Sequence, residues 1–199
     1  MGANPYLTDS ERQVLESARI GIAGAGGLGS NVAAHLVRAG VKKFVICDFD
    51  TVNASNLNRQ FFFRDQLGRK KVAALEENLR RIDPDLELEM RDVRLTAENA
   101  ADTFAACDLV VEAFDNAAAK AMLYGALLPR GVRLVAASGL AGWGRSAAIK
   151  IRQVVANLVL VGDGASGVNA TCAPVSPRVG IAAAMQANAA VAWLLGKEI

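Results

Sequence analysis

The stretch RIGIAGAGGLG at residues 19–29 decides the fold of this chain. Residues 19–23 form a short apolar run that predicts a buried strand, and the glycines after it predict a tight turn. Residues 28–40 then carry apolar side chains at helical spacing and stop at a glycine. Such a strand, turn and helix bring backbone N–H groups and the positive helix end to one point, where a phosphate can bind. The alternative is a turn that needs glycine only for close packing.

Composition is that of one compact α/β domain spanning residues 1–199. Hydrophobic residues make up 52% of the chain, and the net charge of +2 gives no case for nucleic acid or for an anionic membrane. The cysteines, Cys47, Cys107 and Cys172, have no paired spacing, so neither a disulfide framework nor a zinc site is expected. A reducing cytoplasm is the expected location, and residues 1–18 lack the apolar core of a signal peptide.

Strand and helix patterns alternate along most of the chain. Strands are predicted at 43–48, 86–93, 108–114 and 132–137, and helices at 68–82, 97–107 and 116–128. Beyond residue 137 the alternation breaks, because 147–153 and 158–161 both look like strands; antiparallel additions at the sheet edge would explain them. A loop at 162–177 and a buried helix at 178–195 follow, and 1–18 is an N-terminal helical segment. The prediction is a Rossmann-like, mixed and mainly parallel sheet with helices on both faces.

Asp48 ends the second predicted strand, 19 residues after Gly29. This is close to the offset of about 20 residues at which an acid binds the ribose of a nucleotide. The alternative is an ordinary acid at a strand end. Asp50 lies where a turn is expected to begin and is interpreted as structural.

The segment Ser55-Asn56-Leu57-Asn58-Arg59-Gln60 favours chemistry on phosphates. If it is helical, Asn56 and Arg59 lie three apart on one face and can reach one phosphate together. Lys71 enters the next helix as a mobile point charge. The alternatives are a surface salt bridge for Arg59 and a solvated helix face for Lys71.

Asp115 and Asn116 end an apolar strand, at the sheet edge where parallel α/β proteins bind ligands. A carboxylate there can hold Mg²⁺ that bridges ATP oxygens. Alternatively, Asp115 is simply the N-cap of the following helix. Cys172 lies in the predicted loop without a partner base, where a thiol is more often inert than catalytic.

Together these motifs resemble the E1-like superfamily of ThiF, MoeB and ubiquitin-activating enzymes, and most of all the short ThiF-type sulfur carrier protein adenylyltransferases. The resemblance covers residues 19–195. It is carried by the glycine motif, Asp48-Phe49-Asp50, the segment 55–60, Lys71 within Gly68-Arg69-Lys70-Lys71-Val72, and Asp115-Asn116.

The resemblance implies a homodimer that uses ATP and Mg²⁺ to adenylate the C-terminal Gly-Gly carboxylate of a small ubiquitin-like sulfur carrier, in thiamine biosynthesis. It implies Arg59, Lys71 and Asp115 as catalytic residues, with Asp115 also holding the metal. The residues it implies at the nucleotide are Gly24, Gly26, Gly27, Gly29, Asp48, Asn56, Arg59, Lys71, Asp115 and Asn116.

The chain departs from the family pattern in three places. The two C-x-x-C pairs that hold zinc in many relatives are missing, so no zinc is expected. Arg12 is the nearest candidate for an arginine that relatives extend into the partner's active site. Thr171 and Cys172 resemble the place of a conjugating cysteine, although the short loop argues against a covalent sulfur link at Cys172.

Three other functions fit parts of the sequence. An NAD-dependent oxidoreductase is permitted by the glycine turn and Asp48, but Leu128 occupies the lysine position of a Tyr-x-x-x-Lys pair after Tyr124, and no substrate domain is expected. Relatives that adenylate a carboxylate on transfer RNA share the fold, yet this chain has no large basic patch. A non-catalytic binding module would not need Arg59, Lys71 and Asp115 together.

Overall fold

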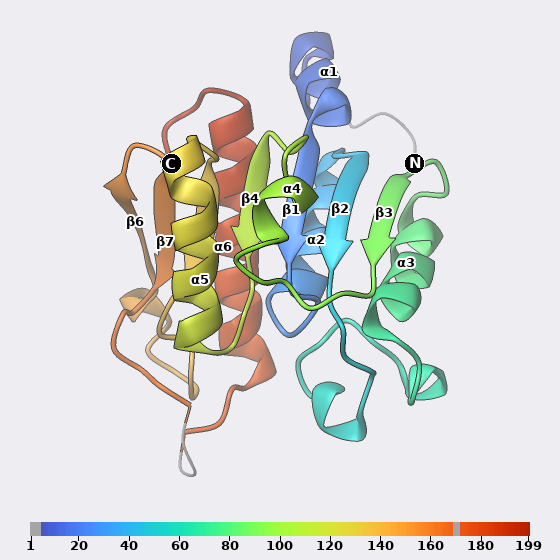
Figure 1. Cartoon of the computed structure of the whole chain (residues 1–199), viewed down its shortest axis with the longest axis vertical. Coiled ribbons are helices and arrows are strands. Elements are labelled where there is room, and N and C mark those ends of the chain that lie inside the picture. Colours follow the sequence, from blue (N-terminus) through green and yellow to red (C-terminus); the bar gives the residue numbers. More distant parts are fainter. Residues whose placement is uncertain (1–4, 169–171) are drawn as a thin grey trace.

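The computed structural model describes residues 5–168 and 172–199. Its centre is a seven-stranded sheet with the order β3-β2-β1-β4-β5-β7-β6 (Figure 1). Neighbouring strands are parallel throughout, except that β6 runs antiparallel to β7. The strands are β1 Arg19–Ala23, β2 Lys43–Cys47, β3 Glu87–Arg91, β4 Leu109–Glu112, β5 Leu134–Ala137, β6 Lys150–Val155 and β7 Leu158–Gly162.

Helices cover both faces of the sheet (Figure 1). One hydrophobic cluster joins the sheet to α2, α3 and α6, and a second joins the other face to α4 and α5. The predicted mainly parallel α/β fold is therefore confirmed. The helices are α1 Asp9–Ser17, α2 Gly29–Ala39, α3 Lys71–Ile82, α4 Ala100–Thr103, α5 Ala117–Leu127 and α6 Ser176–Leu194, and single 3₁₀ turns occur at Ala54–Asn56, Arg64–Gln66, Leu128–Arg130 and Ser146–Ala148.

The central strands are apolar at nearly every position because both of their faces are covered. All residues of β4 and β5 are buried, as are the last four residues of β1. Helix α6 packs on this sheet, and its one buried amide explains the polar interruption in its sequence. The Gln186 Nε2 group donates to the backbone oxygens of Glu112 at 3.0 Å and of Val135 at 3.3 Å, so it joins α6 to β4 and β5.

Two elements differ from the sequence prediction. The helix expected at 97–107 is shorter than predicted and consists of α4 alone. Before α4, the Asn99 side chain accepts a hydrogen bond from Thr96 N, and after it the chain turns at the fully buried Phe104. Of the two strands expected to be antiparallel additions, only β6 is antiparallel. The chain crosses from β5 to the sheet edge, forms β6 and returns as β7, which therefore lies parallel to β5.

The amino and carboxyl ends of the strands have different surroundings. Helix α1 lies beyond the amino ends of the central strands, whereas the glycine turn lies at their carboxyl ends (Figure 1). No helix within the described ranges combines the length and the apolar character that crossing a membrane requires.

Candidate active site

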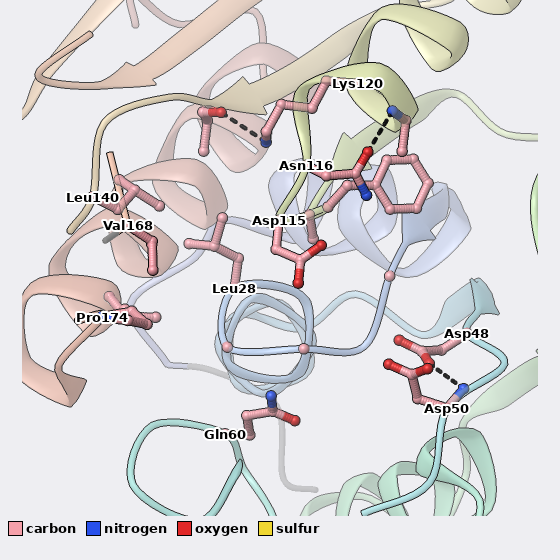
Figure 2. Close-up of a pocket in the computed structure, with 18 of the residues that line it drawn as sticks. Leu28, Asp48, Asp50, Gln60, Asp115, Asn116, Lys120, Leu140, Val168 and Pro174 are labelled. Atoms are coloured by element: carbon pink, nitrogen blue, oxygen red, sulfur yellow. Dashed lines mark hydrogen bonds between the residues drawn. The ribbon is translucent and has the colours of Figure 1, made fainter. Parts of the chain in front are cut away.

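The carboxyl ends of β1, β2, β4 and β5 open into a cavity of about 540 Å³ (Figure 2). This volume is in the range of small-molecule sites. In the sheet order, β1 lies between β2 and β4. The chain therefore builds the sheet on one side of β1 with β2 and β3, and then crosses to the other side to form β4. Open α/β sheets bind their ligands at such a switch point.

The glycine turn forms the floor of the cavity. Gly24, Gly26 and Gly27 line it, as the sequence predicted. The amides of Gly26 and Gly27 donate to no protein group among the residues described, which leaves them available to an anion. Gly29 does not line the cavity. It packs the first turn of α2 against the loop, since a Cβ atom there would lie 1.8 Å from Gly24 O.

Asp48 lies at one end of the cavity and is tied to the glycine turn. Its Oδ2 atom accepts from Ala25 N at 2.7 Å, and its Oδ1 atom accepts from Asp50 N at 2.8 Å. A carboxylate can accept further bonds, so the two ribose hydroxyls of a nucleotide would still find an acceptor.

Lys71 forms an ion pair inside the cavity. Its Nζ atom lies 2.9 Å from Asp50 Oδ2, and the lysine side chain is 7% exposed against 49% for the aspartate. A short ladder holds the two segments together, since Lys71 N donates to Asp50 O and Thr51 bridges to Lys70. The alternative of a solvated helix face is wrong for Lys71.

Arg59 lines the cavity without an acidic partner among the described residues. Its Nη1 atom donates only to Ser55 O and to Asn58 Oδ1, so the surface salt bridge considered from the sequence does not form. Asn31, which the sequence analysis missed, fixes this segment: its Nδ2 atom donates to Arg59 O at 2.9 Å and to Gly27 O at 2.6 Å.

Asn56 does not join Arg59 in the cavity. Residues 54–56 form a single 3₁₀ turn and 57–59 an irregular turn, instead of the continuous helix that would align the two side chains. The Asn56 Oδ1 atom accepts from Asn53 N at 2.9 Å and so closes its own turn.

Asp115 and Asn116 divide the two roles considered for this position. Asn116 is the N-cap of α5, because its Oδ1 atom accepts from Ala119 N at 2.8 Å. Capping is therefore the wrong role for Asp115. The Asp115 carboxylate is exposed in the cavity near Leu28 (Figure 2), with no hydrogen bond to the rest of the described chain.

These features fit a magnesium ion that arrives with a nucleotide. Mg²⁺ is held in nucleotide sites by one or two carboxylates together with phosphate oxygens, and Asp115 is an unpaired carboxylate in such a place. The described residues contain no cluster of three or more His, Cys, Asp or Glu side chains that would form a protein-only metal site.

The sequence model of the ThiF family matches residues 3–199 of this chain. The chain belongs to the ThiF family. The sulfur carrier protein ThiS adenylyltransferase of Escherichia coli is 34% identical over 133 residues, which are 66% of this chain and 53% of that protein. The sulfur carrier protein adenylyltransferase of Thermus thermophilus is 36% identical over 113 residues, 56% of this chain and 42% of that protein. This ThiF-family chain thus spans about half the length of the curated relatives it matches.

Solved structures share the fold of this ThiF-family chain. The E. coli tRNA N6-threonylcarbamoyladenosine dehydratase TcdA, in complex with AMP, superposes with a TM-score of 0.87 at 20% identity, over 94% of this chain and 90% of TcdA. E. coli MccB with ATP gives a TM-score of 0.69 at 17% identity, over 92% and 57%. Identities this low show a common fold alone.

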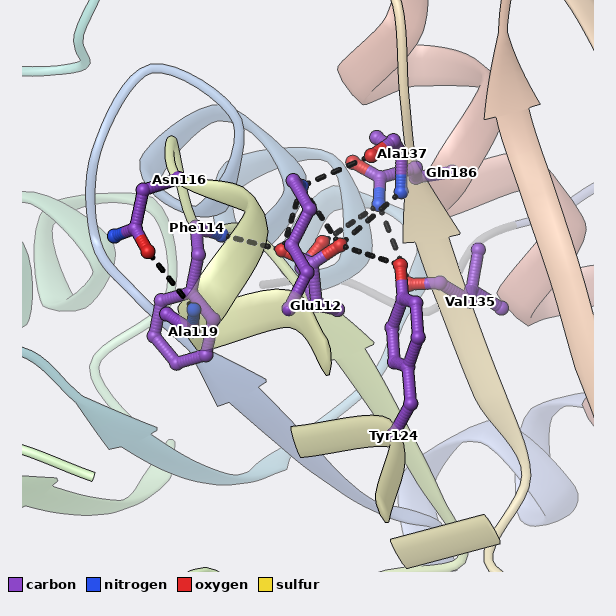
Figure 3. Close-up of polar contacts among 9 residues, drawn as sticks. Glu112, Phe114, Asn116, Ala119, Tyr124, Val135, Ala137 and Gln186 are labelled. Carbon is purple, nitrogen blue, oxygen red and sulfur yellow. Dashed lines mark hydrogen bonds and ion pairs between the residues drawn. The ribbon is translucent and has the colours of Figure 1, made fainter. Parts of the chain in front are cut away.

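A buried network that the sequence analysis missed surrounds Glu112 at the end of β4 (Figure 3). Glu112 is fully buried at the end of β4, and both of its Oε atoms accept from Lys120 Nζ at 2.8 Å. Glu112 also accepts from Phe114 N and from the Tyr124 hydroxyl. The pKa of Tyr124 is raised, mainly by burial and to a smaller extent by the charge of Glu112, so the Tyr124 hydroxyl keeps its proton and donates to Glu112. The network fixes the backbone that carries Asp115.

Lys120→Met should destabilise the fold by ~3–5 kcal/mol, because it leaves the Glu112 carboxylate buried without its cation. Urea unfolding at neutral pH measures this loss. The control is the double variant Glu112→Gln/Lys120→Met, which removes both charges and should recover most of the lost stability. Equal destabilisation in the single and double variants would contradict this account.

The cysteines and Arg12 were also singled out from the sequence. All three cysteines are free, and Cys47 is buried and lines the cavity. Cys172 does not line it and is half-buried against Gly142, whereas Thr171 lies outside the described residues. Arg12 is paired with Asp9 on α1. Because α1 lies beyond the amino ends of the strands, Arg12 does not reach the cavity of its own chain (Figure 1).

Proposed function

We propose that this chain is an ATP-dependent adenylyltransferase. Its substrate is the C-terminal Gly-Gly carboxylate of a small ubiquitin-like, ThiS-like sulfur carrier, and its role lies in thiamine biosynthesis. The observation that carries the proposal is that Arg59 and Asp115 line the same cavity as the glycine turn. Neither side chain has a partner of opposite charge among the residues described, so both are available to a phosphate and its metal.

In this proposal the nucleotide lies along the cavity with its ribose at Asp48 and its phosphates over Gly26 and Gly27. An oxygen of the carrier carboxylate attacks the α-phosphorus, forming an acyl-adenylate, and pyrophosphate leaves. Arg59 and Lys71 would neutralise the charge that grows on the phosphate oxygens, and the pocket would align the two reactants. Asp115 would hold Mg²⁺, which supplies further charge neutralisation when bound.

The Lys71–Asp50 pair gives this scheme a specific feature. A triphosphate must compete with the Asp50 carboxylate for the Lys71 ammonium group. Because Asp50 is half-exposed and Lys71 is buried, the aspartate is the partner that moves toward solvent when phosphate binds. Lys71 then keeps its place at the start of α3.

Two features of the proposal rest on the family resemblance. The first is a homodimer in the cytoplasm, for which light scattering should give twice the chain mass of 20.9 kDa. The second is a protein carrier instead of transfer RNA. Two relatives that share more than 30% identity with this chain are named sulfur carrier protein adenylyltransferases. Others above 30% are named adenylyltransferase and sulfurtransferase or ubiquitin-like modifier-activating enzyme 5, and none of these names mentions transfer RNA, which favours the protein carrier.

The test is exchange of labelled pyrophosphate into ATP. We expect exchange with a carrier that ends in Gly-Gly and none with the same carrier lacking those two glycines. Exchange that requires transfer RNA instead would contradict the proposed substrate while preserving the chemistry. Binding of NADH, detected by its fluorescence, together with no exchange for any carboxylate, would overturn the proposal in favour of an oxidoreductase.

A further inference from the structure

A buried ion pair lies behind the cavity at the start of α6. Arg178 Nη2 contacts Asp163 Oδ2 at 2.5 Å, and the two side chains are 4% and 14% exposed. Arg178 lies in the first turn of α6, where the helix dipole disfavours a cation. Its presence there therefore needs another reason, and its contacts supply one.

Arg178 holds a loop that follows β5. Its Nη1 atom donates to Gly144 O at 2.7 Å and to Arg145 O at 3.2 Å, at a turn where Arg145 adopts a φ of 46°. The same loop is tied to the chain just before α6, since Gly142 N donates to Ala173 O at 2.9 Å. One buried guanidinium thus joins the β5 loop to the start of α6.

Asp163 organises the turn that follows β7. Its Oδ1 atom accepts from Ala165 N and from Ser166 N, both at 2.8 Å, and Asp163 N donates to Gly139 O. Burial alone would raise the pKa of Asp163, but the bonds from Ser166 and Ala165 and the charge of Arg178 outweigh it and lower the pKa to about 2. The Asp163 carboxylate therefore stays ionised at neutral pH.

The segments held by this pair form one wall of the cavity. Figure 2 shows Leu140, Val168 and Pro174 gathered at one end of the cavity, and all three line it. Asp48 and Asp50 lie at the opposite end (Figure 2). A nucleotide with its ribose at Asp48 and its phosphates over the glycine turn leaves this apolar end free for the group joined to the α-phosphate.

We propose that Arg178 and Asp163 are positioning residues that hold the wall against which the acyl part of the adenylate lies. This inference rests on the proposed function, because only an adenylate has an acyl part. Neither residue touches the reacting atoms. They act through the β5 loop and the turn after β7, whose backbone and apolar side chains would contact a narrow peptide tail.

The test compares two small probes by calorimetry. AMP fills the nucleotide part of the cavity alone, and 5′-O-(glycylglycylsulfamoyl)adenosine, a stable mimic of the adenylate, also reaches the wall. Wild type should bind the mimic at least about tenfold more tightly than AMP. Asp163→Asn keeps the acceptor for the two amides but loses the ion pair. It should bind AMP within about twofold of wild type and lose most of its preference for the mimic.

Two further variants complete the design. Arg178→Lys keeps the charge and should recover part of the preference, while Arg130→Met, at the opposite end of the sheet, should change neither affinity. Equal weakening of both probes in Asp163→Asn would make the pair merely structural and overturn the inference. So would a wild type that binds AMP but gains nothing from the glycylglycyl group. A wild type that binds neither probe would instead overturn the proposed function and the inference together.

Discussion

Arg59→Ala should lower carrier-dependent exchange of pyrophosphate into ATP by at least about tenfold, with the fold intact. Loss of one charged donor at a developing negative charge typically costs ~3 kcal/mol of transition-state stabilisation. Arg59 has no ion-pair partner among the described residues, so its removal leaves no buried carboxylate unpaired. The melting temperature should therefore stay close to that of wild type while exchange falls.

Arg64→Ala is the matched control for this prediction. Arg64 is exposed, lies in the next 3₁₀ turn of the same connection, and does not line the cavity. The Arg64→Ala variant loses the same charge from the same region as Arg59→Ala, so its exchange rate should match that of wild type. Full exchange in Arg59→Ala, or equal losses in the two variants, would contradict the role assigned to Arg59.

Gly29→Ala should destabilise the protein by ~3 kcal/mol, the upper end of the usual cost of overpacking, and abolish nucleotide binding. Helix propensity alone predicts the opposite sign, because alanine is favoured over glycine in a helix by about 1 kcal/mol. A Cβ at residue 29 would lie 1.8 Å from Gly24 O and 3.1 Å from the Ile22 side chain. Backbone must move to relieve that contact, and overpacking of this kind costs more than the propensity returns. Urea unfolding measures the difference.

Gly26→Ala is the contrasting variant in the same turn. A Cβ there meets nothing closer than the Gln60 side chain at 3.9 Å, so the fold should keep its wild-type stability. The added methyl group projects beside the cavity floor and should weaken binding of ATP. A stable Gly29→Ala protein, or an unfolded Gly26→Ala protein, would show that the packing of this turn is wrongly described.

Local sequence patterns were enough for the fold and for most of the site. Apolar runs predicted every strand of the sheet, because burial leaves a pattern in neighbouring residues. The alternation of strands with helices predicted that the sheet is mainly parallel. The carboxyl ends of parallel strands meet at one edge. The glycine turn, Asp48 and Asp115, which follow three such strands, were therefore predictable as parts of one cavity.

Contacts between distant segments were not predictable in the same way. Nothing near Asn31 in the sequence indicates that its amide holds the Arg59 segment, 28 residues away. Nothing in the sequence around Glu112 indicates that its carboxylate accepts hydrogen bonds from Lys120 and Tyr124. Asn56 was expected beside Arg59, but a single 3₁₀ turn directs it to its own backbone.

The sequence by itself determined which chemical groups this protein carries and the sheet edge at which most of them lie, since residue type and the alternation of strands and helices are local properties. The tertiary structure alone decided which of those groups remain unpaired. Lys71 is neutralised by Asp50, and Asn116 is the N-cap of α5. Arg59 and Asp115 are left without a partner of opposite charge among the described residues. Pairing depends on distances of a few ångströms between segments far apart in the chain, and folding sets those distances.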